Sequence, residues 1–165
     1  MFLVIDGFNL IYKFIELEEY IYYDKLDEAK LGLLKILEKF QKKRKQNTHI
    51  YVFFDGKKTK GSTVVDDEFG EIKIHYSHDL TADHYIKLYV RSQPNPGSIT
   101  VVSSDKNIML FCQKYKAKVQ KSEDFAKWVE SFFKEEEKEL EEKSESIKLS
   151  EKEIDYWKKL FSQKK

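Results

Sequence analysis

The sequence contains a single cysteine, Cys112, among its 165 residues. One cysteine cannot form an internal disulfide, and it excludes a zinc site built from several cysteines. No apolar run is long enough to span a bilayer, and the first residues lack the basic start of a signal peptide. We therefore expect a cytoplasmic protein with no membrane contact and no disulfide-linked partner.

The sequence also lacks a strong charge of either sign, since its formal net charge is +1. The net charge therefore favours no class of partner, and only local groups of charges can do so. Aromatic residues make up 15% of the chain, which argues against disorder for most of it. A length of 165 residues fits one α/β domain with a short helical appendage.

Acidic residues follow short apolar segments that have the composition of buried strands. Residues 2–5, 50–54 and 99–102 form these segments, and Asp6, Asp55 and Asp105 come at or just after their ends. A fourth acid, Asp83, opens a predicted helix after an alternating strand at residues 71–76. The alternation of strands and helices predicts the α/β class with parallel strand pairs.

The carboxyl ends of parallel strands share one edge of a sheet, where open α/β folds bind ligands. One Asp-Gly after a strand is more often only a turn, and an acid at a helix start is often only a cap. The coincidence of four acids favours a site instead. Clustered carboxylates repel one another unless a cation lies between them, which predicts Mg²⁺ or Mn²⁺. Water bound to such an ion can attack a phosphodiester bond.

Apolar residues at helical spacing predict a helix from about residue 26 to 45 and another over residues 81–91. Residues 63–65 are predicted to pair with residues 71–76 through a turn at Gly70. A long helix is predicted from Ser122, and its later turns are almost wholly charged. Ser150 with Glu153 makes a capping box, which predicts a separate last helix.

Four motifs resemble those of the YacP-like branch of the NYN domains, which belong to the PIN-like nucleases. They are LVIDGFNLI at residues 3–11, VFFDG at 52–56, TAD at 81–83 and VVSSDKNI at 101–108. The resemblance covers about residues 1–125. It implies a three-layer PIN-like (NYN) fold, with a central mainly parallel sheet flanked by helices, over residues 1–133. Residues 134–165 then form a charged helical C-terminal extension.

The resemblance also implies an activity, that of a divalent-metal-dependent endoribonuclease acting on single-stranded RNA. Some relatives act on messenger RNA in association with the ribosome. By position, Asp6, Asp83 and Asp105 are implied as the acids that bind Mg²⁺ or Mn²⁺. Asn9 is implied to orient Asp6 or a water, and Asp55 is an auxiliary acid or a structural turn residue.

Lys87 departs from the family pattern, because relatives commonly have a glutamate there. It lies one helical turn after Asp83, so the two side chains can pair, which lowers the affinity for a metal ion. The alternative function is therefore a catalytically weak or inactive RNA- or ribosome-binding module of the same fold. A phosphatase-like hydrolase that uses Asp6 as nucleophile is disfavoured, because the second acid it needs is replaced by Phe8.

Two groups of side chains are candidates for direct RNA contacts. Lysines near the predicted site can bind phosphates: Lys57, Lys58, Lys60, Lys87 and Lys106. Tyrosines can stack on bases, although abundant aromatic residues more often form core: Tyr12, Tyr22, Tyr23 and Tyr76.

Overall fold

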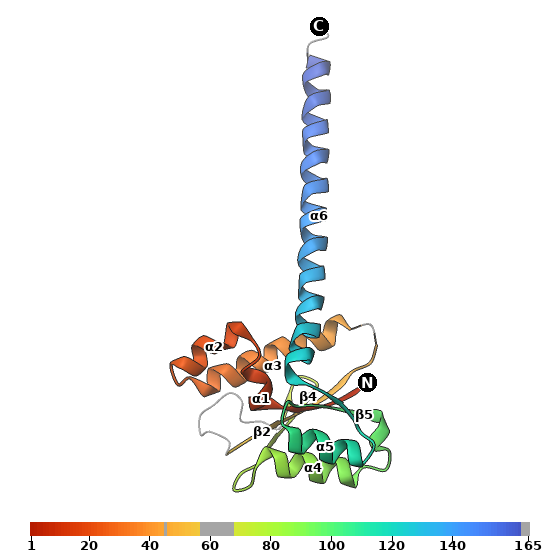
Figure 1. Ribbon diagram of the computed structural model, residues 1–165. Helices are drawn as coiled ribbons and strands as arrows, with labels where there is room; N and C mark the ends of the chain where they lie inside the picture. Colours follow the sequence, from red (N-terminus) through yellow and green to blue (C-terminus); the bar gives the residue numbers. More distant parts are fainter. Residues whose placement is uncertain (45, 57–67, 163–165) are drawn as a thin grey trace. The chain divides into compact units, whose positions relative to one another are not determined.

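The computed structural model describes residues 1–44, 46–56 and 68–162, and the chain forms two compact units, Met1–Trp128 and Val129–Lys165 (Figure 1). The first unit contains a six-stranded sheet in the order β3-β4-β2-β1-β5-β6. The strands are β1 (Phe2–Asp6), β2 (His49–Phe54), β3 (Glu68–Phe69), β4 (Ile72–Tyr76), β5 (Ile99–Val102) and β6 (Lys118–Gln120). All neighbours pair in parallel except β3 and β4.

The register of β1 places the predicted acids near one edge of the sheet. In this central strand Ile5 pairs with Val52 of β2 and with Val102 of β5. Because the three strands run in parallel and end together, Asp6 and the residues that follow β2 and β5 emerge at the same edge. The strands β1, β2 and β5 are nearly continuous apolar runs, as expected for strands with both faces covered.

Helices cover both faces of the sheet (Figure 1). One face carries α1 (Gly7–Ile11), α2 (Ile15–Tyr22) and α3 (Leu26–Lys43), and the other carries α4 (Ala82–Ser92) and α5 (Lys106–Lys114). Val4 and Phe53 face α4 and α5 in a core that includes Ile86 and Cys112. A 3-10 turn, η1 (Pro96–Ser98), precedes β5. The predicted three-layer α/β fold is confirmed.

The structure corrects the expectation of a separate last helix. A single helix, α6 (Ser122–Ser162), runs for 41 residues and continues through position 150. The segment around Ser150 consists mainly of good helix formers and contains neither glycine nor proline. Serine costs only a fraction of a kcal/mol, about 0.5, inside such a helix, so a capping box alone does not interrupt it.

Two other expectations concern the loop between β2 and β4. Residues 63–65, the predicted partner of β4, lie outside the described residues. Within the described part, β3 pairs antiparallel with β4 through Gly70, which has a φ of +59°.

The predicted helix at residues 26–45 is found as α3, and the backbone of Arg44, which follows it, is extended. Among the described residues, no helix is long and apolar enough to cross a membrane.

Candidate functional site

Asp6 is the most enclosed of the predicted site residues, with 8% of its surface exposed. Its Oδ2 accepts a hydrogen bond of 3.0 Å from Ser103 Oγ, and the backbone N–H of Asn9 also favours the ionised form. Burial, and to a smaller extent the negative charges of Asp55 and Asp105, nevertheless raise the pKa of Asp6 to about 6. Asp55 and Asp105 therefore lie close enough to Asp6 to repel its carboxylate.

Asp105 follows β5 and caps α5. Its Oδ1 accepts hydrogen bonds from the backbone N–H groups of Asn107 (2.8 Å) and Ile108 (3.1 Å). Its own N–H donates to Ser103 Oγ at 3.1 Å. Because the same hydroxyl donates to Asp6, Ser103 links the two acids through one oxygen atom.

Asp55 follows β2 and holds the start of α4. Its Oδ1 accepts a 2.6 Å hydrogen bond from the N–H of Ala82. The next residue, Gly56, has a φ of +97° and donates its N–H to Ser77 Oγ at 2.9 Å. Asp55 is thus a turn and capping residue that also adds negative charge near Asp6.

Asp83 lies in the first turn of α4 and pairs with Lys87, whose Nζ is 3.2 Å from Asp83 Oδ1. The Lys87 ammonium also lies 5.6 Å from the centre of the Phe111 ring on α5. Burial raises the pKa of the Cys112 thiol to about 11, while Lys87 lowers this pKa and Asp83 raises it. The pair is therefore close to α5, and its charges act on Cys112.

The Asn9 side chain joins a hydrogen-bond network that the sequence did not reveal. Its Oδ1 accepts from the Ser104 N–H at 2.9 Å and from Ser122 Oγ at 2.6 Å. Ser104 Oγ donates to Glu123 Oε2 and accepts from the Ser122 N–H at 3.0 Å. This network ties α1 and the segment after β5 to the first turn of α6.

Glu123 is a fifth acid near this edge. The hydrogen bond from Ser104 lowers its pKa most, and Lys13, whose Nζ lies 4.0 Å away, lowers it as well. One signal could have found Glu123, because β6 is parallel to β5 and ends at the same edge.

A hard divalent ion fits the chemistry of these acids. Among the described residues, no three histidine, cysteine, aspartate or glutamate side chains are placed to hold one metal ion together. Mg²⁺, however, is usually held by one or two carboxylates, with water and substrate phosphate completing its shell. Asp55 and Asp105 use only Oδ1 in hydrogen bonds to described residues, so each has a second oxygen to offer.

The predicted RNA contacts have different outcomes. Lys57, Lys58 and Lys60 lie outside the described residues. Lys106 is exposed beside Asp105, and Lys87 pairs with Asp83. Among the tyrosine candidates, Tyr76 belongs to the core and cannot stack on a base, because only 4% of its surface is exposed.

Comparison with known proteins supports the fold. The crystal structure of Rae1 (YacP) from Bacillus subtilis superposes with a TM-score of 0.66 at 21% identity, covering 96% of this chain and 93% of that one. A tryptophan-to-leucine mutant of the same Bacillus subtilis protein gives a TM-score of 0.65 at 18% identity, with coverages of 84% and 79%. No curated protein matches the sequence. The family model for the YacP-like NYN domain matches residues 3–162, and the chain therefore belongs to this family of PIN-like nuclease fold.

Proposed function

We propose that this protein is an endoribonuclease that depends on Mg²⁺ or Mn²⁺ and hydrolyses phosphodiester bonds in single-stranded RNA. The observation that carries the proposal is the buried carboxylate of Asp6, whose pKa of about 6 reflects burial and the charges of Asp55 and Asp105. Keeping a carboxylate beside two others costs stability, and a cation removes that cost. Family membership supports a nuclease in general. Association with the ribosome stays a prediction from the resemblance.

Asp6 and Asp105 are the residues we propose to hold the ion, with Asp55 adding negative charge. Asp83, the third predicted ligand, is engaged by Lys87 and has a weaker part in this proposal. When bound, the ion supplies an activated water and neutralises charge on the reacting phosphate. Ser103 serves this arrangement by donating to Asp6 while it accepts from the Asp105 N–H, which fixes the relative positions of the two residues. The Asn9 backbone N–H favours the ionised form of Asp6 directly. The Asn9 side chain acts indirectly, because its amide oxygen accepts hydrogen bonds from Ser104 and Ser122.

Lys106 is the described cation best placed to contact RNA, since it is exposed and adjacent to Asp105. At that position an ammonium can bind a phosphate next to the one that reacts. Lys87 has a less favourable position for this role, because its ammonium is engaged by Asp83 and lies beside Phe111.

The test is cleavage of a labelled single-stranded RNA with Mn²⁺ or Mg²⁺, compared with the same reaction in EDTA. We expect metal-dependent cleavage by the wild type and a loss of at least about a hundredfold in Asp6→Asn. Asp155→Asn on α6 makes the same chemical change at an exposed site and should cleave normally. Cleavage that survives Asp6→Asn would contradict the site assignment.

One observation favours the alternative, a catalytically weak or inactive RNA-binding module. The ion pair between Lys87 and Asp83 places a positive charge where relatives commonly have a glutamate. The Lys87→Glu variant separates the two functions in the same assay. If the wild type binds RNA without cleaving it and Lys87→Glu cleaves, the binding module is correct; if the wild type cleaves, the nuclease is correct.

A further inference from the structure

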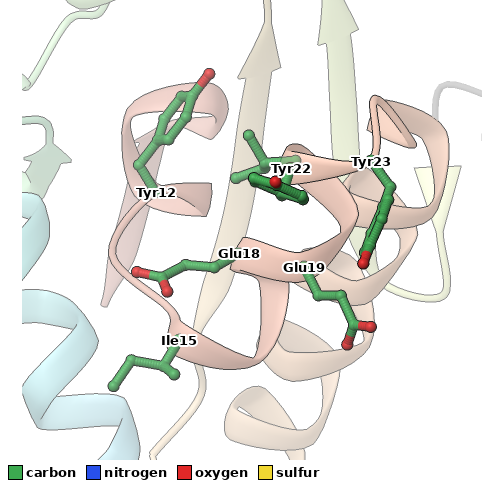
Figure 2. A pocket seen from close by; sticks show the side chains of 7 residues that line it. Tyr12, Ile15, Glu18, Glu19, Tyr22 and Tyr23 are labelled. Carbon is green, nitrogen blue, oxygen red and sulfur yellow. The ribbon is translucent and has the colours of Figure 1, made fainter.

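Three tyrosines surround a hollow on the surface of α1 and α2. The hollow has a volume of about 650 Å³ and is lined by Tyr12, Ile15, Glu18, Glu19, Ile21, Tyr22 and Tyr23. The exposed fractions of Tyr12, Tyr22 and Tyr23 are 56%, 83% and 62%. Figure 2 shows their side chains projecting from the helices, with the Glu18 carboxylate between Tyr12 and Ile15 in this view.

The hollow rests on a firmly held part of the fold. Leu17, on the opposite side of α2, is 3% exposed and packs so closely on Gly32 of α3 that an added Cβ would lie 2.5 Å from it. After α2, Asp24 has a φ of +57°, and the Lys25 N–H donates to Tyr20 O at 2.7 Å. The Tyr22 and Tyr23 rings form an edge-on pair with centroids 5.1 Å apart. The tyrosines are therefore presented by ordered backbone.

The charge of the hollow is negative. Helix α2 contains three glutamates and no basic residue. Glu18 and Glu19 have no hydrogen bond or ion pair from their carboxylates to any described residue, so both are available to a ligand. The nearest cation in sequence, Lys13, is directed to Glu123 at 4.0 Å.

These charges distinguish among possible occupants. Tyrosine rings can stack on unpaired bases, but two free carboxylates would repel the phosphates of RNA. A second copy of the hollow would bring like charges together. A guanidinium or ammonium group, in contrast, is attracted both by the faces of tyrosine rings and by carboxylates.

We propose that this hollow binds an arginine- or lysine-bearing segment of a partner protein. The apolar stem of the basic side chain packs against Ile15 and the tyrosine rings, while its charged end reaches Glu18 or Glu19. The hollow is distinct from the acidic edge of the sheet, so this binding is independent of the proposed cleavage reaction.

The experiment measures fluorescence anisotropy of a short labelled peptide of alternating arginine and glycine, in EDTA so that any cleavage is absent. Tyr22→Ala should weaken binding by roughly tenfold and Glu19→Gln by a few-fold, whereas Tyr22→Phe, which keeps the ring, should bind like the wild type. Tyr156→Ala and Glu145→Gln, both at exposed positions of α6, are the matched controls and should leave binding unchanged. They show whether the peptide binds acidic surfaces in general.

Three results would overturn the proposal. Equal peptide affinity of the wild type and Tyr22→Ala would place binding elsewhere. A labelled single-stranded RNA whose binding falls in Tyr22→Ala, with peptide binding unchanged, would make the hollow a base-stacking surface. A dimer that Tyr22→Ala dissociates in sedimentation analysis, again with peptide binding unchanged, would make it a contact between two copies.

Discussion

A carboxyl group that is 8% exposed and has two other carboxylates nearby ionises at a cost in folding free energy. The folded-state pKa of Asp6 is about 6, against 3.8 for the free group. Each pKa unit corresponds to about 1.4 kcal/mol, so the ionised side chain destabilises the fold by about 3 kcal/mol. Because the folded pKa is the higher one, the folded state binds more protons between these values, and its stability falls as the pH rises through this window.

We predict that, in EDTA, ionisation of Asp6 lowers the free energy of unfolding as the pH rises from about 4 to about 6. At higher pH Asp6 is fully ionised and lowers it no further. Asp6→Asn removes the charge, so it should lack this decline and should exceed the wild type by up to about 3 kcal/mol at neutral pH. Urea denaturation at a series of pH values measures both effects. Asp155→Asn should follow the wild-type curve. Parallel curves for the wild type and Asp6→Asn would show that Asp6 ionises without cost.

At the scale of helices and strands, Gly7 is a point where α1 lies very close to β2. It is the first residue of α1, directly after Asp6, and the ring of Phe54 at the end of β2 occupies the space where a Cβ would be. The Phe53 carbonyl oxygen would lie 3.0 Å from that Cβ. Only glycine lets the turn from β1 into α1 approach β2 this closely.

We predict that Gly7→Ala destabilises the protein by about 1–3 kcal/mol, because Phe54 is fully buried and has little room to move. Gly97→Ala is the matched control. A Cβ there would meet its nearest neighbour at 3.6 Å, which is ordinary van der Waals contact, so its effect should stay within about 0.5 kcal/mol. Thermal or urea denaturation compares the two. Equal effects at both positions would mean that Phe54 rearranges without cost.

Some of the contacts between elements at the candidate site could be predicted from the sequence, and others could not. Asp6, Asp55 and Asp105 could be brought together from sequence alone, because strand polarity and the parallel class fix which residues share an edge. The Ser104–Glu123 contact could not, since it depends on how β6 leads into α6. The Asp83–Lys87 pair followed from helix periodicity, but its position beside Phe111 depends on how α4 packs on α5. Local rules thus predicted positions along elements, and packing decided which elements meet.

At the scale of the whole molecule, α6 belongs to both compact units. Its first turns are part of Met1–Trp128, where Phe125 is fully buried with its ring 5.7 Å from that of Phe40. Every residue described at positions 138–147 and 151–160 is exposed. A helix whose side chains all face solvent depends on propensity and on charge pairs along its own surface, which contribute little to the rest of the fold.

We predict that a chain ending at Glu137 keeps the stability of the first unit, with a melting temperature within about 2 °C of the full-length value, and also keeps its RNA cleavage. The reason is that the removed residues whose burial is described, 138–147 and 151–160, are all exposed. Phe125→Ala, in the same helix but inside the core, should instead cost about 3–5 kcal/mol. Calorimetry of the three proteins makes the comparison. If the shortened chain loses as much stability as Phe125→Ala, the later turns of α6 are part of the folded core, and our proposed boundary between residues 133 and 134 is wrong.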